Sequence, residues 1–199
     1  MIQSSPVRLE RNTRETRISA SLGISDSGKG KFEGTSGIGF FDHMLNSFCV
    51  HGGFEFIATI EGDTFVDCHH TVEDTGIVLG SLFDMLLDDR SGIARFGNAF
   101  VPMDEALAFC AADISGRPFL VFDDGGYIKA HSVGGYDTEI SEEFFRAFAF
   151  NAKLTLHLRL QYGSNAHHCI EALYKAAARA IKQACNLGAA GILSAKGVL

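Results

Sequence analysis

A five-residue pattern, His-His-x-x-Glu, occurs twice in this sequence. One copy is His69–Glu73, the other is His167–Glu171, and about half of the 199-residue chain separates them. Two copies of one pattern at such a spacing indicate an internally duplicated chain. Because a duplicated chain places two similar units side by side, we expect a fold with pseudo-twofold symmetry.

The residues around each copy repeat as well. Each copy begins a stretch with apolar residues at helical spacing and follows a strand-like alternation, over residues 54–60 and 153–160. Further apolar helices are expected before these strands, near residues 40–48 and 142–150. Earlier still, each half should contain a hairpin: the first has strands 18–24 and 31–36 with a turn at 26–30, and the second has strands 106–114 and 119–122 with a turn at 115–118.

Each half is therefore predicted to contain strands, a helix, a strand and a helix. This is a fold of the α+β or α/β class, built from two-layer units in which helices cover one face of a sheet. The two repeats would span about residues 1–97 and 98–199. Since no proline- or serine-rich linker separates them, we expect one compact domain over residues 1–199, with neither half folding alone.

Composition narrows the range of partners. The chain has 17 Lys and Arg against 24 Asp and Glu, a formal net charge of −7, so we expect no binding to nucleic acid or to an anionic membrane. No apolar run approaches the roughly 20 residues that span a membrane, and the N-terminus is too polar for a signal peptide. Five cysteines without a C-x-x-C pair indicate reduced thiols. The sequence thus predicts a cytoplasmic globular protein.

The two motifs suit metal binding. On a helix, a histidine and the glutamate four residues later present an imidazole and a carboxylate to one point, as with His69 and Glu73. Adjacent histidines point about 100° apart on a helix, so His69 and His70 should serve two different ions. A single motif would more simply be surface histidines and an acidic residue at a helix N-terminus. Its repetition favours paired metals, with zinc, iron, manganese and nickel all open.

Several rival sites have weaker support. A zincin-type peptidase needs a second histidine after the glutamate, but Asp74 and Ala172 stand there. Cys68 and Cys169 lie beside the histidines in positions that are not equivalent, so we interpret them as bystanders rather than ligands. The segment Gly28–Lys31 lacks the spacing of a phosphate-binding loop.

Seven short motifs follow one another along nearly the whole chain: Arg14–Thr16, Phe41–Leu45, Asp67–Thr75, Met103–Ala106, Ser115–Pro118, Asn165–Ala172 and Ser194–Gly197. In this order they closely resemble the motifs of the imidazoleglycerol-phosphate dehydratase family. The chain departs from the family at Cys68, where an acidic residue is frequent, and at Cys169, where an aliphatic residue is usual. Both departures leave the expected ligands intact.

The resemblance implies two manganese(II) ions per active site, with zinc or another divalent ion as the alternative, and no organic cofactor. The implied metal ligands are His43, His69, His70, Glu73, His157, His167, His168 and Glu171. The implied substrate-binding residues are Glu15, His51, Arg95, Arg117, Lys175, Ser194 and Lys196, among which the cations would bind a phosphate. Eight ligands for two ions leave positions open for substrate and water, as in catalytic sites.

The resemblance also implies a fold, an assembly and a reaction. The helices of two repeats would pack between two four-stranded sheets, in a homo-oligomer of two dozen subunits with active sites at the interfaces. The reaction would be dehydration of D-erythro-imidazoleglycerol phosphate to imidazole-acetol phosphate in histidine biosynthesis, through an imidazolate and a diazafulvene-like intermediate. Glu15, Glu73 and Glu171 are the candidate proton-transfer residues.

Two other classes of function stay open at this point. A binuclear metallohydrolase would use the same ligands to activate water, and would cleave a phosphate or an amide. A metal-storage protein would need the histidine helices but would have no use for the cations Arg95, Arg117 and Lys196. Substrate turnover tests the first alternative, and anion binding by those cations tests the second.

Overall fold

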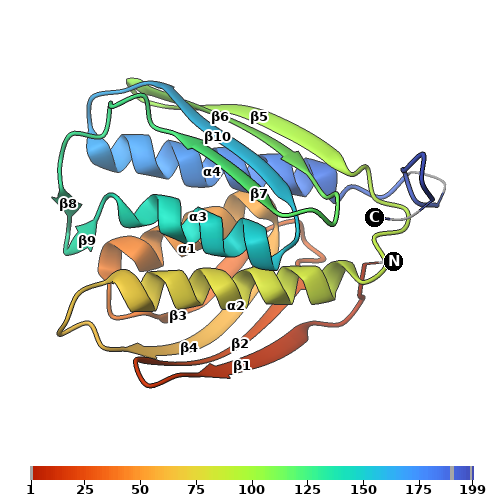
Figure 1. Ribbon diagram of the computed structural model, residues 1–199, viewed down its shortest axis with the longest axis horizontal. Helices are drawn as coiled ribbons and strands as arrows, with labels where there is room; N and C mark the ends of the chain where they lie inside the picture. Colours follow the sequence, from red (N-terminus) through yellow and green to blue (C-terminus); the bar gives the residue numbers. More distant parts are fainter. Residues whose placement is uncertain (1, 189–190, 198) are drawn as a thin grey trace.

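The computed structural model describes residues 2–188, 191–197 and 199, and it arranges them in four layers (Figure 1). A four-stranded sheet forms each outer layer, and the helices fill the space between the sheets. The first half contains β1 (Val7–Asn12), β2 (Thr16–Ile24), β3 (Lys31–Thr35), α1 (Gly39–Gly52), β4 (Phe54–Gly62) and α2 (His69–Leu87). The second half contains β5 (Phe96–Met103), β6 (Ala106–Asp113), β7 (Phe119–Asp123), β8 (Ser132–Val133), β9 (Tyr136–Asp137), α3 (Ile140–Asn151), β10 (Thr155–Tyr162) and α4 (Ala166–Ala184). The predicted fold class is confirmed.

The two sheets share one topology. Their strand orders are β1-β2-β4-β3 and β5-β6-β10-β7. In each sheet the two middle strands pair antiparallel, and the last pair is parallel. A helix, α1 or α3, lies in the connection between the parallel strands, because parallel neighbours need a long crossover.

Strand pairing differs from the prediction at the two expected hairpins. The structure inserts β4 between β2 and β3, and β10 between β6 and β7, so the turns at 26–30 and 115–118 do not join paired strands. The physical reason is burial: β4 and β10 bury about every second side chain against the helices and take the centre, whereas β3 and β7 contain no fully buried residue and stay at the edge.

Two edge strands, β1 and β5, were not predicted from the sequence. In β1 the half-buried Val7 and Leu9 alternate with exposed charged residues, so the apolar signal is weak. In β5 a proline, Pro102, obscures the strand pattern, and it is tolerated because β5 lies at the edge of its sheet.

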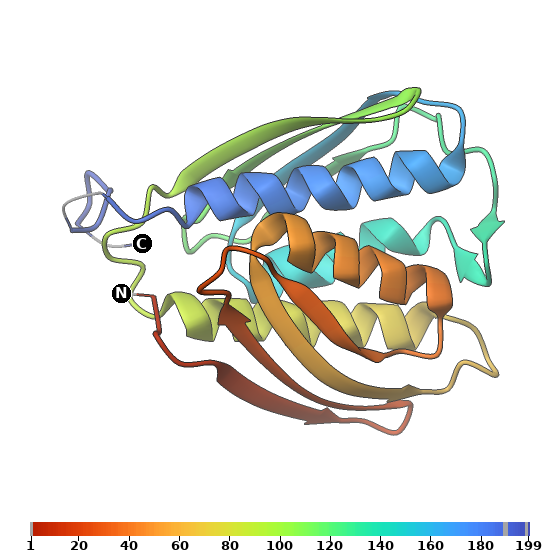
Figure 2. The same cartoon turned by 180° about the vertical axis from the view of Figure 1, so that it is seen from behind.

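The helices pair across the two repeats. α1 packs against α4, and α2 packs against α3 (Figures 1 and 2). Aromatic side chains fill the space between the layers: Phe48 meets Phe148 edge to face with ring centroids 5.7 Å apart, and Phe41 meets Phe144 in the same way at 5.4 Å. Within the described ranges, no helix is both long enough and apolar enough to cross a membrane.

Gly97 lets β5 lie directly on α4. A Cβ atom at this position would be 1.9 Å from the carbonyl oxygen of Ala180 and 2.8 Å from the amide nitrogen of Ala184. Since these are backbone atoms, Gly97→Ala is expected to lower the free energy of unfolding by about 1–3 kcal/mol, measured by urea denaturation at one fixed protein concentration. Gly39→Ala is the matched control, because nothing lies within 4 Å of a Cβ atom there. Equal losses in the two variants would contradict the prediction.

Candidate metal centre

Three of the predicted metal ligands meet where α1 packs on α4. The Nε2 atom of His167 lies 3.4 Å from Oε2 of Glu171, one turn further along α4. The Nε2 atom of His43, from α1, lies 3.6 Å from the same oxygen. All three donor atoms fall within 4.8 Å of one another. Two imidazoles and a carboxylate at such distances can chelate one divalent ion.

Glu171 is held charged in this cluster. Its side chain is only 8% exposed, and Nζ of Lys175 lies 2.7 Å from Oε1. Burial alone would raise the pKa of Glu171, but the hydrogen bond and charge of Lys175, with His43 and His167, outweigh it and hold that pKa below its ordinary value. A carboxylate that is ionised at neutral pH and has one oxygen bound to lysine offers the other oxygen to a metal.

The motif on α2 repeats this arrangement in a more open setting. Nε2 of His69 lies 3.7 Å from Oε2 of Glu73, one helical turn away. Both side chains are more than two-fifths exposed, and Ile77 occupies the place on α2 that Lys175 has on α4. The first motif therefore presents an imidazole and a carboxylate without a lysine one turn beyond the glutamate.

The second histidine of each motif is fixed by a carboxylate on its Nδ1 atom. Nδ1 of His70 lies 3.0 Å from Asp63, and Nδ1 of His168 lies 2.8 Å from Glu105. These hydrogen bonds raise the pKa of both histidines, and the bond from His168 lowers the pKa of Glu105 to about 2. With Nδ1 donating to a carboxylate, Nε2 is left as the metal-binding atom.

Sequence reasoning missed these two carboxylates. Glu105 lies in the turn between β5 and β6, where it also accepts the backbone N–H of Asn165 at 2.7 Å. Asp63 follows β4 directly. The Met103–Ala106 motif includes Glu105, but the sequence predicted no role for that residue. Nothing in the sequence distinguished Asp63 from other loop aspartates.

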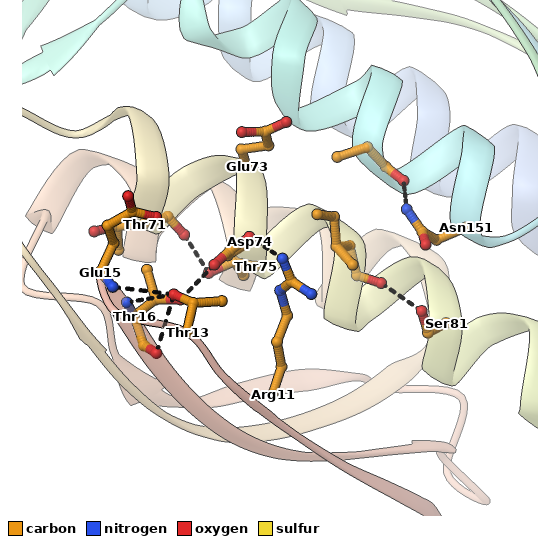
Figure 3. A network of polar contacts seen from close by, with 12 residues as sticks. Arg11, Thr13, Glu15, Thr16, Thr71, Glu73, Asp74, Thr75, Ser81 and Asn151 are labelled. Carbon is orange, nitrogen blue, oxygen red and sulfur yellow. Dashed lines mark hydrogen bonds and ion pairs between the residues drawn. The ribbon is translucent and has the colours of Figure 1, made fainter.

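A buried network holds the turn that carries Glu15 against α2 (Figure 3). Asp74, next to the predicted ligand on α2, accepts hydrogen bonds from Thr16 Oγ1 and, at 2.9 Å, from Arg11. Thr13 Oγ1 in turn accepts the backbone N–H groups of Glu15 at 3.1 Å and of Thr16 at 2.9 Å. The backbone at Glu15 is thus anchored to the motif helix, while its side chain is left exposed.

Two of the predicted phosphate-binding cations, Arg95 and Arg117, lie near the other end of α4, whereas Lys175 is beside Glu171. Both Arg95 and Arg117 face Asp113, at 2.7 and 3.9 Å. The N–H of Arg95 donates to the carbonyl of Ala184, the last residue of α4, whereas His167 is in the first turn of that helix. A helix of 19 residues is about 28 Å long, so one chain does not bring these arginines to its own His167.

The remaining predicted residues are spread over the surface. His51 lies in the last turn of α1, and its pKa is lowered by partial burial and by neighbouring cations, Lys175 first among them. Ser194 accepts the N–H of Lys196 in the C-terminal segment. His157 lies on β10 between the buried Leu156 and Leu158, so its exposed side chain faces away from the helices. Within one chain, His157 does not join the other predicted ligands.

Cys68 and Cys169 stay outside the cluster. Both are buried, and burial raises the pKa of Cys169 to about 11 and also raises the pKa of Cys68. Neither thiol contributes to the group of donors around Glu171.

Comparisons with known proteins assign the chain to a family. The sequence model described as imidazoleglycerol-phosphate dehydratase matches residues 36–181. The imidazoleglycerol-phosphate dehydratase of Acetivibrio thermocellus is 49% identical, over 96% of this chain and 97% of its own length. That of Bacillus cereus is 50% identical over the full length of both. The crystal structure of the Staphylococcus aureus enzyme superimposes with a TM-score of 0.80 at 37% identity, covering 92% of this chain and all of that chain.

The duplicated fold and these relatives together define the chain as a carbon–oxygen lyase that removes water from its substrate. It belongs to the imidazoleglycerol-phosphate dehydratase family. Its reaction, dehydration of imidazoleglycerol phosphate, is a step of histidine biosynthesis.

Proposed function

We propose that the chain forms imidazole-acetol phosphate from D-erythro-imidazoleglycerol phosphate with two manganese(II) ions, zinc or another divalent ion being the alternative. The observation that carries this is the group of three donors from His43, His167 and Glu171 within 4.8 Å. Nitrogen and charged oxygen donors together suit manganese and zinc. The residues present therefore fit a divalent ion.

The ions would be held by the histidines and glutamates of the two motifs with His43, and they would make the imidazole ring of the substrate an electron sink. Glu15 is the carboxylate best suited to move the proton at the substrate side chain, because it is exposed while its backbone is anchored through Thr16 to Asp74. Glu73 and Glu171 are the alternatives. Lys175 favours a ligand role for Glu171, since it stabilises the charged form.

We propose further that active sites lie between copies of the chain. Arg95, Arg117, Lys175, Ser194 and Lys196 would bind the substrate phosphate, and the first two lie about a helix length from His167 in the same chain. A homo-oligomer of two dozen subunits would supply the cations of one copy to the metal group of another. The five free cysteines support a cytoplasmic location.

The test is turnover of imidazoleglycerol phosphate by metal-stripped protein, with and without added manganese, while metal content and molecular mass are followed. Formation of the acetol phosphate only after manganese is restored, by a large assembly, is the expected result. Full turnover by protein with no detectable divalent ion would contradict the metal proposal. Full turnover by an isolated single chain would contradict the interfacial site.

A further inference from the structure

The start of α1, residues Gly39–His43, touches two of the three donors in the cluster around Glu171. It carries His43, whose Nε2 atom lies 3.6 Å from Oε2 of Glu171. It also carries Phe40, a buried side chain whose ring meets the ring of His167 edge to face, with ring centroids 5.0 Å apart. A movement of the start of α1 would therefore displace both imidazoles of the cluster.

Asp42, within the start of α1, binds the chain that leads into the helix. Its Oδ1 atom accepts the backbone N–H of the buried Ser36 at 2.7 Å and the hydroxyl of the same residue at 2.6 Å. Its Oδ2 atom accepts the hydroxyl of Thr35, the last residue of β3, at 2.7 Å. The N-cap residue Ile38 makes no side-chain cap. Asp42 thus ties the helix start to the end of β3.

Asp42 acts on the cluster without belonging to it. Both of its carboxylate oxygens accept hydrogen bonds from the end of β3, and the group of donors within 4.8 Å consists of His43, His167 and Glu171. Distances between a metal ion and its ligands vary by only about 0.2 Å. A small shift of the helix start would therefore be enough to spoil the approach of His43 to Glu171.

The second repeat shows that this tie depends on a short connection. Residues 36–38 separate β3 from α1, whereas the much longer segment 124–139 separates β7 from α3. When the buried residues of the two helices are aligned, Glu142 of α3 corresponds to Asp42 of α1. Glu142 binds Arg146 on its own helix at 2.5 Å. The carboxylate at this position reaches back to a strand in α1, the helix that supplies His43.

We propose that Asp42 is a positioning residue for the metal-binding group, because it holds the start of α1 on β3 and so sets the place of His43 beside Glu171. This rests on the proposed metal dependence. The effect comes from hydrogen bonds rather than from charge. Asparagine can keep the bonds, since its carbonyl oxygen can accept from Ser36 and its amide can donate to the hydroxyl of Thr35, whereas alanine removes all of them.

The experiment measures bound manganese per chain and its dissociation constants by equilibrium dialysis of the intact, metal-stripped oligomer. Wild type should hold two ions. Asp42→Ala should weaken one of them by roughly 10- to 100-fold, the usual effect of removing a group that holds a ligand in place, and leave the other unchanged. Asp42→Asn should bind both ions as wild type does. In Asp42→Ala, half-maximal turnover should need more manganese, while kcat at saturating manganese is retained.

Asn46→Ala is the matched control. Asn46 lies one helical turn after Asp42, and its Oδ1 atom accepts the backbone N–H of Phe32 in β3 at 3.3 Å. The variant thus removes another bond between α1 and β3, away from the helix start, and should keep both ions. Thr35→Val removes one of the three bonds to Asp42 and should weaken the same ion by a smaller factor, which keeps the test possible if Asp42→Ala does not assemble.

Three outcomes would overturn the assignment. The first is two unchanged manganese ions in Asp42→Ala or, where that variant does not assemble, in Thr35→Val. The second is an equal loss of both ions in Asp42→Ala, or any loss in Asn46→Ala, which would mark a general effect on α1. The third is an Asp42→Asn variant as impaired as Asp42→Ala, which would assign the effect to charge.

The same measurement separates this proposal from the one on which it rests. Wild type that binds no manganese would overturn the cofactor proposal and this one together. Wild type with two ions and an unaffected Asp42→Ala would overturn this one alone.

Discussion

Glu171→Gln is expected to lower kcat/KM for imidazoleglycerol phosphate by on the order of 10³-fold. The charged carboxylate would be lost from a cluster in which it meets His43, His167 and Lys175. An amide is a poor ligand for a divalent ion, and loss of a metal's contribution to the transition state is worth several kcal/mol, or about three powers of ten. Steady-state kinetics with saturating manganese measures the effect.

The control for this variant is Glu33→Gln. Glu33 also binds a lysine, Lys31, at 2.8 Å, close to the 2.7 Å contact of the Glu171 pair, but that pair is on the exposed surface. Removing it should leave kcat/KM unchanged because exposed ion pairs contribute little. Activity within tenfold of wild type in Glu171→Gln would contradict a metal-binding role for Glu171.

Two variants that are each inactive alone are expected to regain activity when their chains assemble into one mixed oligomer. Arg117→Ala removes a proposed phosphate ligand, and Glu171→Gln removes a proposed metal ligand, at opposite ends of α4. If each site takes its metal group from one copy and its phosphate group from another, co-expression in equal amounts leaves roughly a quarter of the sites with both parts intact. Turnover of the purified mixed oligomer measures this fraction.

The comparison is with each variant expressed alone, which should be almost inactive. An oligomer that carries both substitutions in every chain is the second control, because no mixture of identical chains can regain both parts. Mixed oligomers no more active than the single variants would show that both residues serve a site within one chain.

The sequence predicted the helices and inner strands because their apolar periodicity is strong. Both motif helices begin as expected, and the centre of each sheet lies in the predicted alternating runs 54–60 and 153–160. The strand order was not predicted correctly, because turn residues at 26–30 are equally compatible with a hairpin and with a connection that leaves room for β4. Burial in the finished sheet decides between them.

The candidate site was predicted in part. The spacing within each motif brought His167 to Glu171, since one helical turn determines that distance, but the meeting with His43 depends on how α1 packs on α4. The carboxylates Asp63 and Glu105 act from a loop and a turn, and their reach to a histidine is fixed only by tertiary structure. The spacing of residues along the sequence does not predict such tertiary contacts.

The pairing of the first helix with the last has a consequence for synthesis of the chain. α1 packs on α4, which ends at Ala184 of 199 residues. A ribosome therefore has to make every residue from α1 to the end of α4 before the buried face of α1 meets its native partner along its full length. Until then the emerging first half exposes apolar surface of the kind that aggregates or recruits chaperones, so synthesis of α4, rather than completion of the first repeat, sets the earliest moment at which the core can close.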